Sequence, residues 1–306
     1  MHEEEKKSTL DQAGELRLLV EKKKDKENVF LKPTRSLAIV SGKGGVGKSS
    51  FSVNISLALS DLGASVILMD ADMGMANIDL LLGLAPRYSL AHVVRGSRDF
   101  DEVMIDVDAR VAVIPGGSGV QEMADADEDT FLRLFEKLTS LEKKADFLII
   151  DTGAGIHKDV LTFALASDSV MVVTTPEPPS IRDAYGLMKV LALESKSKAD
   201  VHLVVNMAHG KREADETAER IRKVAHRFLS LDVTYDGFIP ADDKVRQAIR
   251  LQRPVLREYP YSLASASFRS LALGFMGNKE QKILPPSRGL KTFFLRLVRG
   301  VQRMEL

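Results

Sequence analysis

The stretch that decides the fold is residues 41–50, SGKGGVGKSS, which stands between an apolar run, LAIV at 37–40, and a segment of helical periodicity at 51–62. It contains the pattern G-x-x-x-x-G-K-S in the strand-to-helix setting that a phosphate-binding loop requires. In such a loop, backbone N–H groups and the first turn of the helix surround phosphate oxygens. The alternative is a glycine-rich turn without a ligand. We expect nucleotide binding by the residues of this loop, which are Gly42, Gly44, Gly45, Val46, Gly47, Lys48, Ser49 and Ser50.

Further apolar runs of strand length follow this loop, each succeeded by a segment of helical periodicity. They are VILMD (66–70), VAVIP (111–115), FLIID (147–151), VMVVTTP (170–176), HLVVN (202–206) and GFIP (237–240). Short, β-branched runs that are apolar at successive positions are typical of strands covered on both faces. Their alternation with helices predicts an α/β fold with a doubly wound, mainly parallel sheet and helices on both faces.

The composition excludes several classes of function. Lys+Arg and Asp+Glu both number 43, so the net charge gives no bias towards DNA or a charged surface. The absence of cysteine excludes disulfides, thiolate metal sites and thiol nucleophiles. Residues 1–12 contain no secretory apolar core, and no segment approaches the ~20 apolar residues of a spanning helix. We therefore expect a cytoplasmic protein that is neither exported nor integral to a membrane.

The chain divides into four parts by charge and periodicity. Residues 1–34 form a charged extension, 35–278 the nucleotide-binding domain, 279–288 a linker, and 289–306 an amphipathic helix. The linker contains two consecutive prolines, which cannot continue a helix.

Lys43, the second lysine of the loop, distinguishes this chain from most P-loop enzymes. The sequence K-G-G-x-G-K-S at 43–49 resembles the deviant Walker A signature of the MinD/ParA family, in which the first lysine contacts the nucleotide of the opposite protomer. A cation that arrives only on dimerisation can neutralise transition-state charge, as an arginine finger does. The resemblance implies an Mg²⁺-dependent ATPase that forms a homodimer with ATP. The alternative reading of Lys43 is a solvated loop lysine.

Three further segments resemble landmarks of that family. Residues 70–77 are similar to its switch I, D-x-D-x-G-x-x-N, and FLIID at 147–151 is similar to a Walker B strand. The resemblance implies that Asp72 positions the attacking water, so that Lys43, Lys48 and Asp72 are the catalytic residues. It also implies that Ser49, Asp70 and Asp151 form the magnesium site. Asp70 or Asp72 could instead cap a helix. Switch II would be Thr152, Gly153 and Gly155, with Gly153 where the wider family commonly has proline.

The adenine base of the nucleotide is expected to bind at the ends of two later strands. Asn206 carries both the donor and the acceptor that adenine pairing needs, although it could be only a strand-end turn residue. Pro240 and Asp242 lie in a segment that resembles the second adenine loop of the family. The sequence contains no N-K-x-D guanine motif, so ATP and ADP are the expected nucleotides.

The C-terminal segment 289–304, GLKTFFLRLVRGVQRM, has apolar residues at helical spacing and basic residues towards another face. It is too short and too charged to cross a bilayer, which indicates a helix lying on an anionic membrane. The segment resembles the membrane-targeting sequence of the family. The alternative is a helix docked on its own domain. The residues expected at the membrane are Phe293, Phe294, Arg296, Leu297, Val298, Arg299 and Val301.

The N-terminal extension contains D-Q-A-x-x-L-R at 11–17, which resembles the leader of the FlhG group within the MinD/ParA family. That group regulates flagellar number and placement. The resemblance implies that the leader stimulates FlhF, a GTPase of the signal-recognition-particle type, and that the domain acts with flagellar C-ring proteins. A disordered leader is the alternative. The residues of the motif are Asp11, Gln12, Ala13, Leu16 and Arg17.

Three other functions stay open. Division-site placement of the MinD type shares the membrane helix but needs no leader. Partitioning of the ParA type needs a basic DNA face, and we expect no DNA binding. A scaffold that does not hydrolyse ATP would tolerate loss of Asp72.

Overall fold

The computed structural model describes residues 33–72, 77–117, 144–194, 200–277 and 289–303, and the single residues 119, 122, 130, 133, 137, 141 and 142. The motif predicted to bind a GTPase (11–17), the linker 279–288 and part of switch I (73–76) lie outside these residues. Their predicted roles stay predictions.

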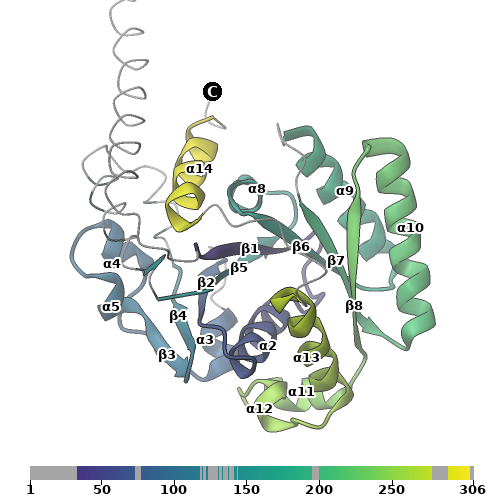
Figure 1. The fold of residues 1–306 in the computed structure, drawn as a ribbon, viewed down its shortest axis with the longest axis horizontal. Coiled ribbons are helices and arrows are strands. Elements are labelled where there is room, and N and C mark those ends of the chain that lie inside the picture. The colour runs from purple at the N-terminus through teal and green to yellow at the C-terminus, as the bar shows by residue number, and fades with distance from the viewer. Residues whose placement is uncertain are drawn as a thin grey trace, which may run out of the picture. The chain divides into compact units, whose positions relative to one another are not determined.

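One eight-stranded sheet forms the centre of the domain, in the order β3-β4-β2-β5-β1-β6-β7-β8 (Figure 1). All neighbouring strands are parallel except β3 and β4, so the predicted mainly parallel sheet is confirmed. Each of the apolar runs identified in the sequence lies in a strand. The strands are β1 (Arg35–Ser41), β2 (Val66–Ala71), β3 (Ile105–Asp108), β4 (Val111–Ile114), β5 (Phe147–Ala154), β6 (Ser169–Thr174), β7 (Val201–Ala208) and β8 (Val233–Pro240).

The edge strand β3 was not predicted. Its four residues, IDVD, contain no continuous apolar run, and none of them is fully buried. It lies at one edge of the sheet and pairs antiparallel with its one neighbouring strand, β4. Tertiary pairing therefore decides this strand, because its local sequence carries little signal.

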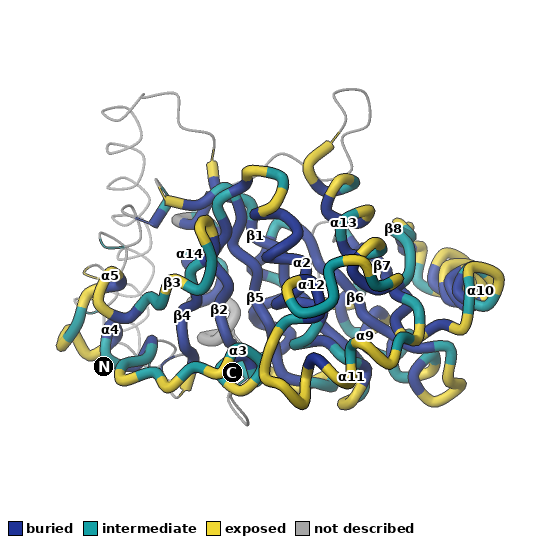
Figure 2. Tube along the Cα trace, turned by 90° about the horizontal axis from the view of Figure 1, so that it is seen from below, coloured by how far each residue is buried: buried dark blue, intermediate teal, exposed yellow. Residues whose placement is uncertain are grey.

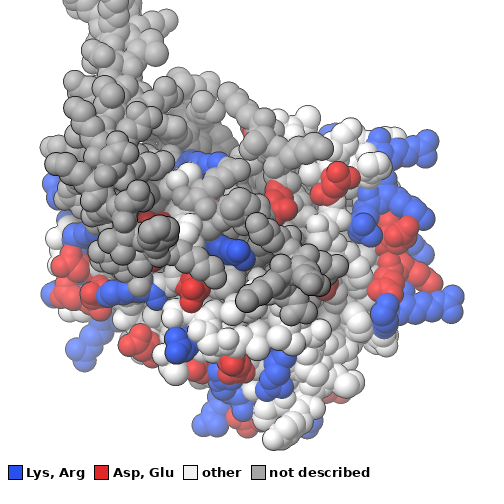
Figure 3. Space-filling model, viewed as in Figure 1, with Lys and Arg blue, Asp and Glu red and all other residues white. Residues whose placement is uncertain are grey.

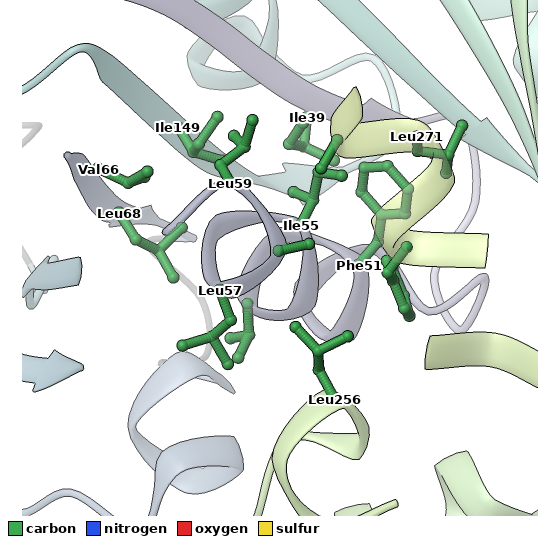
Figure 4. Packing of buried hydrophobic residues seen from close by; sticks show 14 of the residues in the cluster. Ile39, Phe51, Ile55, Leu57, Leu59, Val66, Leu68, Ile149, Leu256 and Leu271 are labelled. Atoms are coloured by element: carbon green, nitrogen blue, oxygen red, sulfur yellow. The ribbon is translucent and has the colours of Figure 1, made fainter. Parts of the chain in front are cut away.

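Helices α2 (Lys48–Asp61) and α13 (Leu263–Met276) cover one face of the sheet. Phe51, Ile55 and Leu59 project from α2 into a buried cluster with Ile39 and Ile149 of the sheet (Figure 4). The Phe51 ring lies 5.8 Å from the Phe268 ring of α13. Three short helices border this layer, α3 (Asn77–Leu82), α11 (Asp243–Arg250) and α12 (Val255–Glu258).

The other face is covered by α8 (Lys158–Ala166), α9 (Pro178–Glu194) and α10 (Lys211–Leu229), whose apolar sides pack on the sheet. Two short helices, α4 (Leu90–Val94) and α5 (Phe100–Val103), lie towards the β3 edge. Figure 2 shows the consequence, with the central strands buried and exposure confined to the outer helices and loops. The doubly wound arrangement predicted from the alternation of strands and helices is thus confirmed.

The C-terminal segment forms a helix, α14 (Gly289–Arg303), that packs against α8. Its side chains Leu290, Phe293, Phe294 and Leu297 are at most 2% exposed. The Phe293 ring stacks on Phe163 of α8 at 6.4 Å. In this structure the apolar face of α14 therefore lies on its own domain, which is the alternative reading of this segment. Arg296 is half-buried, and the side chains of Val298, Arg299 and Val301 lie outside the described residues.

The start of α14 is held by Glu142, whose carboxylate accepts a hydrogen bond from the Leu290 N–H at 3.0 Å. Gly289 has a φ of 80°, and a Cβ there would meet the Glu142 carboxylate, so glycine fits this approach. None of the helices in the described part of the chain is long and apolar enough to cross a bilayer.

Candidate nucleotide-binding site

The loop 42–47 connects β1 to α2 at the C-terminal edge of the central strands. Gly45 and Gly47 have φ values of 80° and 84°, a region that residues with a Cβ rarely adopt. A Cβ on Gly42 would lie 2.1 Å from the Asp183 carbonyl oxygen of α9, so glycine is needed there for packing. Glycine is therefore required at three positions of the loop, by conformation at two and by close approach at the third, and nucleotide binding by the loop stays a prediction.

Lys48 begins α2 and is buried, with 7% of its side chain exposed. Its Nζ donates to the carbonyl oxygen of Thr152 and lies 3.3 Å from Oδ1 of Asp151. Lys48 is far from Asp151 and Thr152 along the chain, and the pairing of β1 with β5 brings them together. Lys48 thus bridges the phosphate loop and the predicted Walker B strand.

Asp151 is fully buried in β5, which continues to Ala154, and one oxygen of Asp151 has no partner. Oδ1 accepts a hydrogen bond from the Ser52 hydroxyl at 2.9 Å, whereas Oδ2 makes no hydrogen bond. A buried carboxylate oxygen without a partner carries a large desolvation cost unless a cation or donor reaches it. Its register partner on β2 is Asp70, so two predicted metal residues lie side by side.

Burial raises the pKa of Asp70 to about 7, with a further contribution from the negative charges of Asp151 and Asp79. Hydrogen bonds from the N–H groups of Asp72 and Ile78 act in the opposite direction. Asp79 is a half-buried carboxyl group, whose pKa burial also raises. A divalent cation would stabilise a site that brings several carboxyl groups together in this way.

The donor set fits Mg²⁺. Oxygen ligands are the ones this ion prefers, and the site offers Oδ2 of Asp151, the carboxylate of Asp70 and the hydroxyl of Ser49 in the first turn of α2. Ser49 is half-buried and next to Lys48, so a phosphate on the loop would share the ion with it. These are the three residues that the sequence analysis predicted for the metal.

Ser52 is a residue of the site that the sequence analysis missed. It lies one turn after Lys48 on α2, is fully buried, and contacts both the Lys48 carbonyl at 3.1 Å and Asp151. The spacing of four residues was the available signal, because it places Ser52 on the same face of the helix as Lys48.

Asp72 and switch II meet at Gly153. A Cβ at this position would lie 3.7 Å from Oδ1 of Asp72 and 3.9 Å from Oδ2 of Asp159, the latter in the first turn of α8. Gly153 therefore lies between two carboxylates. Thr152 donates through Oγ1 to the Ile39 carbonyl at 3.0 Å, and Gly155 donates through N–H to Ser41 at 2.8 Å, which ties switch II to β1.

Lys43 is paired within its own chain. Its Nζ lies 3.3 Å from Oε2 of Glu177, in the loop between β6 and α9; the Lys43 side chain is 42% exposed and that of Glu177 is 67% exposed. An exposed pair of this kind is weak, typically below ~1 kcal/mol. Lys43 is therefore readily available to another partner.

The residues predicted for the base already have partners in the protein. The Asn206 amide nitrogen donates to the Val46 carbonyl at 2.7 Å, and its oxygen accepts from the Met207 N–H at 3.0 Å. Asp242 caps α11 by accepting from the Lys244 N–H at 2.9 Å, and it also accepts from the Ala264 N–H at 3.2 Å. Pro240 ends β8 beside them. Asn206 thus supports the phosphate loop, and adenine recognition by these residues stays a prediction.

A separate cavity of about 720 Å³ lies between β2, β4 and α5, at the opposite edge of the sheet. It is lined by residues such as Ser65, Asp106 and Lys144 and contains none of the predicted site residues. This cavity is therefore separate from the phosphate loop and from the strand ends that carry Asp70 and Asp151.

Known proteins resemble this chain over most of its length. The AAA domain family matches residues 34–203. The antiactivator FleN of Pseudomonas aeruginosa is 39% identical over 240 residues, which cover 78% of this chain and 85% of FleN. The flagellum site-determining protein YlxH of Helicobacter pylori is 35% identical over 269 residues, which cover 87% of this chain and 90% of YlxH.

Comparison with solved structures supports the same family. MinD of Pyrococcus horikoshii in complex with Mg-ADP superposes with a TM-score of 0.62 at 27% identity, covering 78% of this chain and 94% of that one. The fold, the two-lysine loop, the carboxylates at the ends of β2 and β5 and these relatives agree. The chain belongs to the MinD/ParA family of P-loop ATPases, in the group that contains FleN and YlxH.

Proposed function

We propose that this chain hydrolyses ATP with Mg²⁺, couples the nucleotide to homodimerisation and membrane residence, and thereby regulates the number and placement of flagella. The observation that carries the proposal is the partnerless buried Oδ2 of Asp151 beside a loop with two lysines, in a chain 39% identical to FleN. The name of YlxH, a flagellum site-determining protein, supports the same role.

Each residue of the site has a distinct task in hydrolysis. Lys48 leaves its contacts with Asp151 and Thr152 and binds the β- and γ-phosphates, together with the backbone N–H groups of the loop. Asp151, Asp70 and Ser49 would hold Mg²⁺, which when bound would supply positive charge to offset the negative charge of the phosphates. Asp72 orients the attacking water.

Lys43 completes the site across a dimer. It exchanges the exposed carboxylate of Glu177 for the triphosphate bound by the opposite protomer, where its charge stabilises the transition state. Breaking the ion pair between Lys43 and Glu177 costs little free energy because the pair is solvated. ATP thus favours the dimer, and hydrolysis releases it.

Membrane residence follows from α14. Its four fully buried apolar side chains each gain about 1.5–3 kcal/mol from burial, whether they contact α8 or lipid acyl chains. Because docking and insertion bury the same side chains, the apolar contribution to the free energy is similar in the two states, and a bias from another source decides between them. A dimer supplies that bias, since two helices on one body act together and gain ~10²–10⁴ in avidity. The protein would then lie on the inner face of the cell membrane at flagellar sites.

The leader 1–34 is the segment that we propose for the partner GTPase. Its D-Q-A-x-x-L-R motif would stimulate FlhF, and the ATPase domain would contact C-ring proteins. A peptide of residues 1–34 is expected to raise GTP hydrolysis by FlhF. An unchanged GTPase rate would remove this part of the proposal.

Division-site placement is the second candidate. The septum site-determining protein MinD of Bacillus subtilis is 30% identical over 247 residues, which cover 79% of this chain. That function needs the ATPase and α14 but not the leader. Deletion of residues 1–30 would then leave the cellular phenotype unchanged, whereas the flagellar function predicts an altered flagellar number.

Vesicle co-sedimentation tests the coupling. The wild-type protein is incubated with anionic vesicles and ATP, ADP or no nucleotide, beside Lys43→Ala and a chain ending at Ser287. We expect sedimentation of the wild type with ATP, and none of either variant above background. Binding that is indifferent to nucleotide would refute the coupling, and equal binding of the shortened chain would refute the role of α14.

A further inference from the structure

Helix α10 is divided into two halves of different charge. Its first half contains both basic and acidic side chains, which pair at a spacing of four residues, as in Lys211–Asp215 at 2.5 Å and Arg212–Glu216 at 3.0 Å. The second half, residues 220–229 (RIRKVAHRFL), contains no acidic residue. Four exposed basic side chains lie there, Arg220, Arg222, Lys223 and Arg227. We call this half the basic end of α10.

The basic end also exposes apolar side chains. Phe228 is 65% exposed and Val224 is 38% exposed, and the two share a face of the helix at a spacing of four residues. The guanidinium of Arg227 lies 5.3 Å from the centre of the Phe228 ring. Leu193, at the end of the neighbouring helix α9, is 73% exposed. Basic groups are thus mixed with exposed apolar surface.

Interactions within the protein explain only part of this mixture of basic and exposed apolar side chains. Basic residues near the C-terminus of a helix interact favourably with its dipole, and Arg222 donates through Nε to the Val233 carbonyl at 2.9 Å. Lys223 pairs with Glu219 at 3.0 Å. None of these roles requires Phe228 to face solvent, where a large aromatic side chain gains nothing in folding.

The topology places the basic end at the same edge of the sheet as the root of α14. Helix α10 follows β7 and precedes the parallel strand β8, so its C-terminus lies at the N-terminal edge of the strands. The start of α14 contacts Glu142 just before β5, at that same edge. Figure 1 shows α14 and the ends of α9 and α10 at the upper side, and Figure 3 shows basic side chains in the upper part of the right-hand edge.

We propose that the basic end of α10, with Leu193 of α9, is a second membrane contact that binds anionic lipid headgroups and fixes the orientation of the protein on the bilayer. The inference rests on the proposed membrane function and adds a surface outside α14. Exposed Phe and Leu among basic groups match the interfacial region of an anionic bilayer, where aromatic side chains insert and basic ones meet phosphates. A nucleic-acid surface would gain little from Leu193 and Val224. The contact is exposed while α14 is docked, and it adds to the ATP-dependent binding of α14 without replacing it.

The absence of tryptophan from the sequence allows a direct test. Phe228→Trp in the full chain places a single fluorophore at the proposed contact. The matched control is Tyr261→Trp, because Tyr261 is 99% exposed and lies at the opposite edge of the sheet. It precedes α13, and the far end of α13 contacts His202 at the start of β7, so the near end lies at the C-terminal edge. With phosphatidylglycerol vesicles and ATP, we expect a blue shift of Trp fluorescence for F228W and none for Y261W.

Charge reversal tests the electrostatic part. Lys223→Glu with Arg227→Glu is compared with Lys211→Glu with Arg212→Glu, which changes the net charge equally on the same helix. The first pair is expected to weaken binding to phosphatidylglycerol vesicles by about tenfold or more, and the second by less than about twofold.

The outcomes separate this inference from the proposed function. If F228W sediments with vesicles but its emission is unshifted, the second contact is wrong and the role of α14 stands. If the wild type never sediments and F228W is unshifted, both are wrong. If F228W responds to duplex DNA and not to vesicles, the surface belongs to nucleic acid and the inference is overturned.

Discussion

The two edges of the sheet differ in whether their buried polar groups have hydrogen-bond partners. Among the described residues, four buried side-chain atoms lack a hydrogen-bond partner, and three of them lie at the C-terminal edge, on Asp79, Asp151 and Thr175. At the N-terminal edge, by contrast, His202 is fully buried and lies 2.8 Å from Asp236 and 2.9 Å from Asp200. The C-terminal edge thus leaves three polar atoms available for a ligand, whereas His202 at the N-terminal edge is satisfied within the protein; the fourth atom without a partner, Oη of Tyr235, lies on β8.

This difference separates function from stability. Orphaned polar atoms cost free energy of folding and persist where a ligand compensates them. Paired groups and docked apolar side chains, such as those of α14, stabilise the fold without any ligand. Substitutions at the first edge should therefore change catalysis with little effect on stability, and substitutions at the second should do the reverse.

The largest effect is expected at Lys48. Lys48→Gln removes the charge that we propose binds the β- and γ-phosphates, so ATP hydrolysis should fall by roughly 10³-fold or more. Phosphate release measures this rate, and thermal unfolding without nucleotide checks the fold. A variant that unfolds as much as it loses activity would break the proposed separation of the two edges.

Phe294→Ala should have the next largest effect, on stability. Removing a fully buried aromatic side chain typically costs about 3–5 kcal/mol, which should loosen α14. Hydrogen exchange of residues 289–297 reports the change. Leu295→Ala is the matched control, because Leu295 lies on the same helix but is only half-buried. Equal exchange in the two variants would argue against a specific docking site.

His202 should make stability depend on pH. Burial opposes its protonation, but hydrogen bonds to Asp200 and Asp236 prevail and raise the pKa of His202 to about 9. A folded pKa above the unfolded value of about 6.5 stabilises the fold fully below pH ~6.5 and progressively less as the pH rises towards 9. The free energy of unfolding of the wild type should thus exceed that of His202→Asn most at pH 6 and least at pH 9.5.

His226 provides the control for that experiment. It lies 2.9 Å from Asp232, but both side chains are 75% exposed. Solvent screening makes such a pair weak, so His226→Asn should change the pH dependence very little. A pH profile of His202→Asn that parallels the wild type would contradict the buried ion pair.

Ser52→Ala should give the smallest effect. Without its hydroxyl, Asp151 loses the hydrogen bond that orients Oδ2, so the Mg²⁺ concentration for half-maximal hydrolysis should rise about tenfold while the fold is retained. Ser56→Ala is the control, since Ser56 is equally buried on α2 but donates only to the Ser52 carbonyl at 2.7 Å. An unchanged Mg²⁺ dependence in Ser52→Ala would show that Asp151 needs no such support.

Sequence reasoning succeeded where short-range patterns determine structure. The apolar runs predicted the strands from β1 to β8 apart from β3, and the glycine-rich loop predicted a phosphate site at the end of β1. Asp70 and Asp151 were expected at strand ends, and the parallel sheet places them in register. The prediction works here because strand ends and a following loop are neighbours in sequence as well as in space.

Partners distant in the sequence could not be predicted. The contact of Lys43 with Glu177 joins residues 134 positions apart, and that of Asn206 with Val46 joins residues 160 apart. The membrane reading of α14 rested on its amphipathic pattern, yet that pattern suits docking on α8 equally well. Periodicity identifies an apolar face, but it does not identify what covers that face.

The sequence by itself determined the fold class, the phosphate loop and the carboxylates beside it, because glycine conformation, helix starts and strand ends are local properties of the chain. The tertiary structure alone decided which oxygen of Asp151 stays without a partner, where α14 packs and which half of α10 lies at the same edge of the sheet as the start of α14. Those features depend on how distant segments pack, since burial and electrostatic pairing arise only when the strands and helices are assembled.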